Sequence, residues 1–168
     1  MQRRQIMQYT LLGIGTGVLT MNFFRSSHAA EPAAKFEVEL TKEKWREKLN
    51  PEQFRVLREH GTERAGSSAL DNEKRTGVFH CAGCELALFD AATKYNSGTG
   101  WPSFFKPIDN AIGTQVDRSL FSVRTEVHCR RCGGHLGHVF EDGPAPTGLR
   151  YCMNGIAMTF TAADTAAD

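Results

Sequence analysis

The sequence has 168 residues, 40% of them hydrophobic and 23% charged, which fits one globular domain of ordinary size and argues against a second large one. Lys and Arg number 20 against 19 Asp and Glu, so the net charge of +1 gives no electrostatic reason to expect a nucleic acid or another polyanion as partner. Five cysteines are an odd number, and four of them form two C-x-x-C pairs. This pattern favours a metal site plus one spare thiol over a disulfide framework.

The first thirty residues have the order of an export signal. Arg3 and Arg4 precede an uncharged, mildly apolar run over 5–24, and small residues follow up to Ala30, as in a cleavable signal peptide over 1–30. The paired arginines resemble the twin-arginine signal that exports folded proteins. We therefore expect the chain in the bacterial periplasm or an equivalent lumen. An uncleaved N-terminal anchor is the alternative.

Two helices are predicted after a short tether over 31–40. Over 41–49, Trp45 and Leu49 lie four residues apart among charged residues, which is the pattern of an amphipathic surface helix. Asn50 is followed by Pro and, three residues after the cap, by Gln. This is an N-cap signature and predicts a second helix.

From Gly77 onward, short apolar runs bounded by Gly, Pro, Asn or Asp predict short antiparallel strands. The predicted fold is α+β, with a helical N-terminal segment packed on a mostly antiparallel β domain within 41–162 and a frayed tail over 163–168. The predicted strands are 78–80, 86–89, 120–124, 138–140 and 156–160. The phenylalanines left to the core are Phe104, Phe105, Phe140 and Phe160.

The four paired cysteines are Cys81, Cys84, Cys129 and Cys132. Each pair makes a tight turn in which two sulfurs converge, and two such turns form a tetrahedral four-thiolate zinc site. Disulfides within or between the pairs and a redox C-x-x-C are alternatives, and iron could take the same ligands. Because 44 residues separate the pairs, we expect zinc to staple two distant hairpins. Because four ligands close its shell, we expect a structural metal.

Cys152 is the spare thiol, and the pattern places it at the start of the last predicted strand. A lone cysteine is commonly a small buried hydrophobe, but an exported protein exposes an unpaired thiol to oxidants unless its reactivity is useful. Arg150 could lower the pKa of this thiol, and His135 or His138 could supply a proton if the fold brings them near. Cys152 is therefore a candidate reactive cysteine.

Five short stretches, taken together, point to a family. They are Ser97–Phe104, His135–Phe140, Asp142–Pro144, Pro146–Gly148 and Arg150–Asn154. They closely resemble the B-type peptide methionine sulfoxide reductases. The cysteine pairs and the helical lead-in resemble the same family in order and spacing, so the resemblance covers about residues 41–160.

The resemblance implies a fold of two antiparallel sheets and reduction of the R epimer of methionine sulfoxide, mainly within proteins. By likeness, Cys152 is the nucleophile that becomes a sulfenic acid. His138 resembles the group that protonates or hydrogen-bonds the departing oxygen, with His135 close by to orient water or share that role. Arg150 is a candidate for tuning the thiolate.

The resemblance assigns substrate binding to Trp101 and Asn154. Trp101 resembles the aromatic wall that holds the ε-methyl group, and Asn154 resembles the amide that orients the substrate through hydrogen bonds. Taken alone, such a Trp is more often a plain core anchor. The expected partners are oxidised proteins or peptides that carry methionine-R-sulfoxide.

The chain departs from the family at Thr99, where many members carry a resolving cysteine. With the other four cysteines committed to zinc, we expect a one-cysteine cycle in which an external thiol reductant, such as a thioredoxin-like protein, reduces the Cys152 sulfenic acid. Gly155 stands in place of a usual Ser, and Ala65-Gly66 in place of a common Pro-Phe pair. Both changes remove bulk near the expected substrate groove.

Three other functions fit part of the pattern. A noncatalytic zinc-binding interaction module explains the cysteine pairs but not Cys152 beside Arg150. A zinc enzyme with His135 and His138 as ligands requires fewer than four thiolates and an open coordination position. A zinc protein that binds nucleic acid fits least, because removal of three leader arginines from the 20 basic residues leaves 17 against 19 acidic ones. We expect a monomer.

Overall fold

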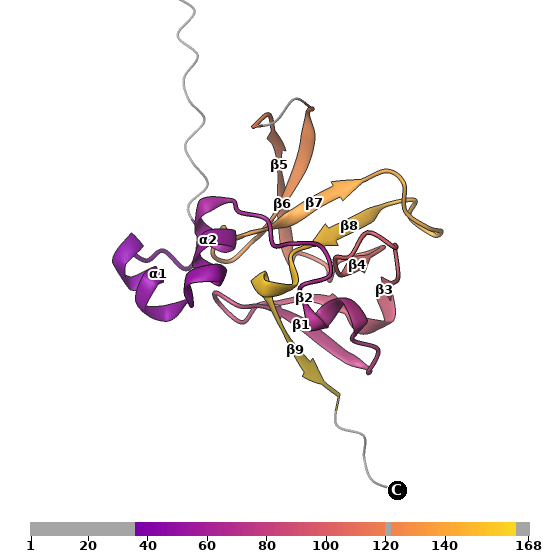
Figure 1. Cartoon of the computed structure of the whole chain (residues 1–168), viewed down its shortest axis with the longest axis horizontal. Coiled ribbons are helices and arrows are strands. Elements are labelled where there is room, and N and C mark those ends of the chain that lie inside the picture. Colours follow the sequence, from indigo (N-terminus) through magenta and orange to yellow (C-terminus); the bar gives the residue numbers. More distant parts are fainter. Residues whose placement is uncertain (1–35, 120–121, 164–168) are drawn as a thin grey trace, which may run out of the picture. The chain divides into compact units, whose positions relative to one another are not determined.

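The structure is a computed structural model that describes residues 36–119 and 122–163 (Figure 1). The export signal predicted over 1–30 and residues 164–168 of the predicted tail lie outside the described residues. Within the described part of the chain, none of the helices has the length and apolar character needed to cross a bilayer.

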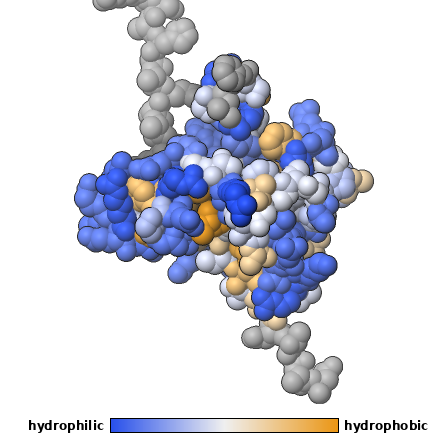
Figure 2. Space-filling model, viewed as in Figure 1, coloured by the Kyte–Doolittle hydropathy of each residue, from blue (hydrophilic) through white to orange (hydrophobic). Residues whose placement is uncertain are grey.

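Two short helices open the described part of the chain. α1 spans Lys42–Lys48, and the Thr41 side chain caps it by accepting a backbone hydrogen bond from its first turn. α2 spans Pro51–Glu59, and Asn50 and Gln53 form the predicted capping box at its start. The apolar faces of both helices are buried, whereas the part of this segment seen in Figure 2 is mostly hydrophilic. The buried side chains are Trp45, Phe54, Val56 and Leu57.

Antiparallel strands form two sheets. The strands are β1 Gly77–Cys81, β2 Ala87–Asp90, β3 Lys94–Tyr95, β4 Ser103–Phe104, β5 Ile112–Asp117, β6 Arg124–Cys129, β7 His135–Phe140, β8 Arg150–Met153 and β9 Met158–Ala162. The smaller sheet has the order β2-β1-β9, and the larger has the order β3-β4-β8-β7-β6-β5. β8 therefore lies inside the larger sheet between β4 and β7, while β5 and β6 project from it as a hairpin (Figure 1). This confirms the expected two-sheet α+β arrangement.

Aromatic rings join the two sheets. Phe104 of β4 stacks on Phe89 of β2 with ring centroids 4.3 Å apart, and it meets Phe79 of β1 edge-on at 5.0 Å. All three rings are fully buried. Of the other phenylalanines predicted for the core, Phe160 packs partly against it, whereas Phe105 and Phe140 are half-buried.

The hairpin of β5 and β6 differs from the prediction. Residues 120–121 of the strand predicted over 120–124 lie outside the described residues, and the observed strand β6 begins only at Arg124. β5 had no predicted counterpart. Its residues Thr114, Gln115 and Val116 are all exposed, so the strand lacks the alternating apolar face on which a prediction depends.

The strand predicted over 156–160 is also displaced. A short 3-10 helix, η3, covers Gly155–Ala157, and β9 begins at Met158. Cys152 is therefore not at the start of the last strand. It lies on the separate strand β8, which belongs to the other sheet.

The described end of the predicted tether lies against the domain. The backbone N–H of Val38 donates a hydrogen bond to the carbonyl of Arg131 at 3.0 Å. Glu37 pairs with Arg130 at 2.6 Å, and the Phe36 ring meets an imidazole of β6 edge-on. Residues 36–38 are thus packed on the turn between β6 and β7.

Candidate active site

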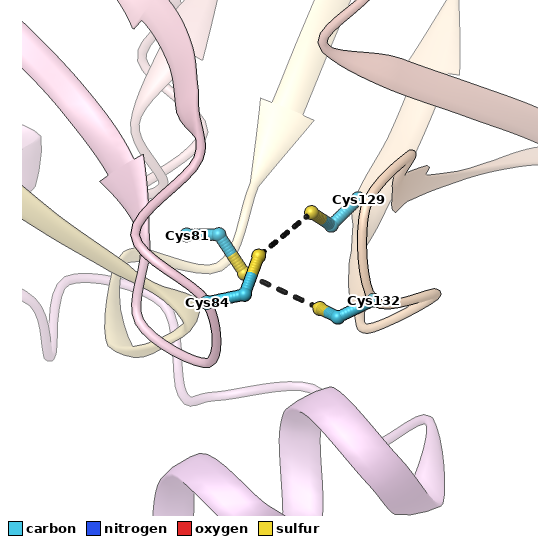
Figure 3. Close-up of side chains that lie close together, drawn as sticks. All are labelled: Cys81, Cys84, Cys129 and Cys132. Atoms are coloured by element: carbon cyan, nitrogen blue, oxygen red, sulfur yellow. Dashed lines mark hydrogen bonds between the residues drawn. The ribbon is translucent and has the colours of Figure 1, made fainter. Parts of the chain in front are cut away.

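The two cysteine pairs come together although they belong to different sheets (Figure 3). Cys81 and Cys84 lie where β1 turns toward β2, and Cys129 and Cys132 lie where β6 turns toward β7. The Sγ atoms of Cys81 and Cys132 are 3.7 Å apart, and those of Cys84 and Cys129 are 3.5 Å apart. All four sulfurs lie within 4.8 Å of one another, and all four cysteines are free rather than disulfide-bonded.

This arrangement fits a tetrahedral metal ion. With metal–sulfur bonds of about 2.3 Å, sulfurs at the corners of a regular tetrahedron lie about 3.8 Å apart. The cluster bridges the β1–β2 hairpin of the smaller sheet and the β6–β7 hairpin of the larger one, so the predicted link between distant hairpins is confirmed for the cysteines. Because the group contains four thiols and no imidazole, it does not support the alternative in which His135 and His138 bind this metal.

Cys152 lies in the interior of the larger sheet, on β8. Its partners across the neighbouring strands are His138 on β7 and Ser103 on β4. Directly opposed residues in antiparallel strands lie on the same face of the sheet. The strand register therefore brings the spare thiol beside one of the two predicted histidines.

A pocket of about 210 Å³ opens beside this thiol. Five of the six residues predicted for catalysis and substrate binding line it, and His135 is the exception. The five are Cys152, His138, Arg150, Trp101 and Asn154. Thr99 lines the same pocket, as do four residues that the sequence did not single out for the site: Thr62, Arg124, Gly137 and Phe140.

A short chain of hydroxyl groups reaches the thiol. Thr99 Oγ1 lies 3.8 Å from Cys152 Sγ. Ser97 Oγ lies 2.8 Å from Thr99 Oγ1 and 2.7 Å from Ser103 Oγ. Ser97 therefore holds in place the hydroxyl that faces the sulfur.

Burial raises the pKa of the Cys152 thiol. Hydrogen bonding to Thr99 and the charge of Arg150 act in the opposite direction without cancelling the effect of burial. Arg150 thus lowers the pKa of the Cys152 thiol, as predicted. Burial has the larger effect, so the thiol ionises less readily than an ordinary cysteine.

Arg150 is held rigidly beside the pocket. Its guanidinium donates two hydrogen bonds of 2.8 Å to the carboxylate of Asp142 and stacks 4.3 Å from the centre of the Phe140 ring. The paired carboxylate raises the pKa of Arg150 further and neutralises part of its charge. This explains why its effect on the thiol is limited.

His138 is oriented by an acid on the neighbouring hairpin. Its Nε2 lies 2.8 Å from Asp117 Oδ2, and the same oxygen accepts a 2.6 Å hydrogen bond from Arg124. Burial lowers the pKa of His138, while the bond to Asp117 favours the protonated ring. Hydrogen bonds from Ser119 and His138 hold the pKa of Asp117 well below its usual range, so this partner stays ionised.

His135 is buried beside the pocket rather than in it. Its Nδ1 lies 2.6 Å from Glu126 Oε1, and its ring centroid lies 5.4 Å from that of His138. Only 2% of His135 is exposed. It contacts His138, the predicted proton donor, in an edge-on ring arrangement.

Asn154 has both ends of its amide engaged within the protein. Its Oδ1 accepts a 2.9 Å hydrogen bond from the backbone N–H of Glu63, and its Nδ2 donates a 3.0 Å bond to the carbonyl of Leu136. Asn154 is 3% exposed and lines the pocket, and these two hydrogen bonds fix the orientation of its amide while the second N–H of Nδ2 has no partner among them.

Glu63 connects the two residues predicted for substrate binding. Its carbonyl accepts a 3.2 Å hydrogen bond from Trp101 Nε1, and its N–H is the donor to Asn154. Its carboxylate accepts backbone hydrogen bonds from Gly155 at 2.5 Å and from Ile156 at 3.0 Å. One buried glutamate thus joins the tryptophan wall to the turn that follows β8.

Sequence reasoning missed three acids that hold the site together, namely Glu63, Asp117 and Glu126. Their partners Asn154, His138 and His135 lie 91, 21 and 9 residues away along the chain, and no spacing rule links them. Acids of this kind are usually solvated, so only their burial in the fold distinguishes them. The half-buried Phe140, left to the core by the sequence, lines the pocket instead.

Comparison with known proteins agrees with the resemblance. The SelR domain family model matches residues 49–162. The chain is 52% identical over 123 residues to peptide methionine sulfoxide reductase MsrB of Pseudomonas putida (strain GB-1), which covers 73% of this chain and 94% of that protein. It is 50% identical over 126 residues to the Leptospira interrogans protein of the same name, covering 74% and 96%. It is 47% identical over 130 residues to the chloroplastic peptide methionine sulfoxide reductase B1 of Arabidopsis thaliana, covering 77% and 64%.

The matched domain includes both cysteine pairs, Cys152 and every residue that lines the pocket beside it. The similarity therefore spans the whole candidate site as well as the fold. On this evidence the chain belongs to the B-type peptide methionine sulfoxide reductases, a family of oxidoreductases.

Proposed function

We propose that this chain reduces the R epimer of methionine sulfoxide in proteins and peptides, with Cys152 as the nucleophile. The observation that carries the proposal is the register of the larger sheet, which places the free thiol of Cys152 opposite His138 in a pocket also walled by Trp101. A noncatalytic zinc-binding module accounts for the four clustered cysteines but requires no thiol and imidazole in a pocket.

The chemistry that this geometry supports is an oxygen transfer from sulfur to sulfur. The Cys152 thiolate attacks the sulfoxide sulfur while the sulfoxide oxygen is protonated, and the oxygen ends on the cysteine. Methionine and a Cys152 sulfenic acid result, so the substrate sulfur is reduced and the cysteine sulfur oxidised by two electrons. His138, kept in orientation by Asp117, supplies or hydrogen-bonds the proton.

Trp101 supports the selectivity for one epimer. Its indole N–H is tied to the Glu63 carbonyl, so the ring keeps a fixed orientation in the pocket wall. A fixed apolar face holds the ε-methyl group and excludes water, which leaves the sulfoxide oxygen to face His138 in only one configuration at sulfur. Asn154, held in orientation by Glu63 and Leu136, lines the pocket and orients the substrate through its second amide N–H.

The sulfenic acid is then reduced from outside the chain. None of the four clustered cysteines lines the pocket, and Thr99 is the residue that faces Cys152 there. One external thiol forms a mixed disulfide with Cys152 and releases water, and a second thiol releases the Cys152 thiol. A thioredoxin-like dithiol protein supplies both thiols.

The cysteine cluster holds one structural zinc ion. Cys81, Cys84, Cys129 and Cys132 would be its ligands, and the bound ion supplies a crosslink between the two sheets rather than a catalytic position. Iron remains the competing metal for the same thiolates. Metal analysis of the purified chain distinguishes them.

The leader supports export. Arg3, Arg4 and the uncharged run that follows them direct the folded chain across a membrane, after which the signal is removed. The test is the mass of the protein recovered from the periplasm. Loss of about thirty N-terminal residues supports export, and an intact N-terminus in a membrane fraction indicates an anchor instead.

The decisive assay uses separated R and S sulfoxide peptides with dithiothreitol as the dithiol. We expect the chain to consume the R peptide and leave the S peptide. Cys152→Ser is expected to abolish reduction while the metal content stays at one ion, because the thiol and the cluster are separate. Equal consumption of both epimers would contradict the selectivity, and activity in Cys152→Ser would contradict the nucleophile.

A further inference from the structure

A second group of metal-binding side chains lies beside the active site. It consists of His60, Glu126 and His135, whose ligand atoms all lie within 4.8 Å of one another. Glu126 Oε1 lies 3.0 Å from His60 Nδ1 and 2.6 Å from His135 Nδ1. The three residues come from the end of α2, from β6 and from β7, so the fold rather than local sequence assembles them.

The donor set and its support match a metal site. Two imidazoles and one carboxylate form a common ligand set for zinc and for other divalent first-row ions. The second carboxylate oxygen of Glu126 accepts a hydrogen bond from Gln115, which leaves Oε1 directed at the two histidines. Such outer hydrogen bonds are what orient metal-binding carboxylates.

The group is also accessible. Glu126 and His135 are buried, whereas His60 has 60% of its side chain exposed and stands at the outer edge. A cavity of about 360 Å³ is lined by all three residues. An ion can therefore enter from solvent and keep open coordination positions toward the cavity, filled by water.

We propose that His60, Glu126 and His135 bind a divalent transition-metal ion and that its binding inhibits the reductase. For the ion to bind, each Nδ1 gives up its proton to solvent or to Nε2 and offers its lone pair. The bound ion adds positive charge at His135, whose ring contacts His138 at a centroid distance of 5.4 Å. The same cavity is also lined by His138 and Asp117, so the ion and its bound waters lie beside the pair that orients the predicted proton donor and disturb that pair. The inhibition rests on the proposed function, whereas the binding does not.

Binding is tested by calorimetry with zinc chloride on the Cys152→Ser chain, preloaded with one equivalent of zinc so that the cluster is filled and no thiol is free. We expect one further equivalent to bind. His60→Gly in the same background should weaken it about tenfold or more. Glycine suits this position because residue 60 has φ 54°, so the variant keeps the end of α2 while losing the imidazole. Asp109→Asn, which removes an exposed carboxylate outside both metal-binding groups, is the control and should bind as the parent does.

The activity arm uses the chain with Cys152 intact. In a single turnover without dithiothreitol, which chelates zinc, metal added beyond one equivalent is expected to slow reduction of the R-sulfoxide, and His60→Gly should keep the metal-free rate and resist the inhibition. Absence of a second binding event, or equal affinity in His60→Gly, overturns the site. Equal inhibition of both proteins shows that the inhibitory ion does not act through His60 and overturns the regulatory part. If the parent shows no turnover at all, the proposed function fails while calorimetry still decides on the site.

Discussion

Thr99 is the side chain on which the proposed one-cysteine cycle depends. Its Oγ1 lies 3.8 Å from Cys152 Sγ, so a sulfur in this place needs to move by only about 2 Å to form a disulfide bond. We predict that Thr99→Cys forms a disulfide with Cys152 after one turnover. Mass spectrometry of tryptic peptides, with the metal retained, should show the two peptides linked.

The parent chain provides the comparison for this variant. After one turnover it should carry Cys152 as a sulfenic acid or an adduct with an added thiol. A disulfide between Cys152 and one of the clustered cysteines in the parent would contradict the one-cysteine cycle. Thr99→Ser, which keeps the hydroxyl, should behave as the parent.

The ionisation of Cys152 gives a prediction that depends on pH. Because burial raises the pKa of this thiol, its thiolate fraction at neutral pH is smaller than that of an ordinary cysteine. The fraction therefore continues to rise at pH values above the pKa of an ordinary cysteine. Alkylation by iodoacetamide should therefore accelerate up to and above about pH 9. Arg150→Met should slow alkylation at pH 8, because loss of the nearby positive charge raises the pKa further.

Lys44→Met is the matched control for that experiment. Lys44 is exposed on α1 and does not line the pocket, so its loss should leave the rate unchanged. The measurement follows the mass added to the Cys152 peptide. A rate that levels off below about pH 8 would show that burial does not dominate.

Glu63 joins three segments that are distant in the sequence. The loop after α2, the segment that carries Trp101 and the turn after β8 all meet at this residue. In Glu63→Gln one oxygen still accepts a backbone N–H, but the amide nitrogen faces the second N–H and leaves it unpaired. We predict a loss of about 1–3 kcal/mol in the free energy of unfolding, measured by urea denaturation.

The same variant should affect the reaction. If Glu63 positions the tryptophan wall, Glu63→Gln should raise KM for the R peptide more than it lowers kcat, whereas a purely structural role changes neither once the protein is folded. Glu47→Gln, at an exposed position of α1, should leave both stability and kinetics at the parent values. A parent-like KM in Glu63→Gln would contradict the positioning role.

The elements that the sequence predicted best are those whose signals are local. The cap at Asn50 fixed the start of α2, and the apolar run near Phe79 located β1. The sequence does not predict β5, because the exposed residues of this strand show no alternation of apolar and polar side chains. It predicts a strand where η3 lies, because hydrophobicity alone does not distinguish a short helical turn from a strand. Local patterns therefore located elements more reliably than their ends.

The residues of the candidate site likewise fall into those that the sequence could predict and those that only the folded structure reveals. Cys152 and the cysteine pairs carry their chemistry in the residue type and spacing, so they could be named without a structure. Glu63 and Asp117 act through hydrogen bonds that cross the fold, and their roles depend on burial that only tertiary packing creates. The sequence predicted that His135 lies near His138, and the two rings are in contact. That His135 does not line the pocket depends on the direction of its side chain, which only the folded structure gives.

In the domain as a whole, the proposed zinc ion would crosslink two sheets that also pack against each other. Phe79, Phe89 and Phe104 form the apolar part of that interface. Structural zinc sites contribute on the order of 10 kcal/mol of binding free energy, which is comparable to the entire stability of an ordinary domain. Metal loss should therefore affect the folding of the whole domain and not only the two turns.

We predict that Cys84→Ser lowers the melting temperature by about 10 °C or more and loses the bound metal, because three thiolates hold zinc much less tightly than four. Cys84 is the suitable position since it is the only half-buried member of the cluster, so the substitution disturbs apolar packing least. Thermal unfolding followed by circular dichroism, with metal content measured on the same samples, is the test. Cys152→Ser should keep both its metal and its melting temperature, since that thiol lies outside the cluster. If the parent chain, stripped of metal by a chelator and verified as metal-free, melted at the same temperature as before, the cluster would have no role in holding the two sheets together.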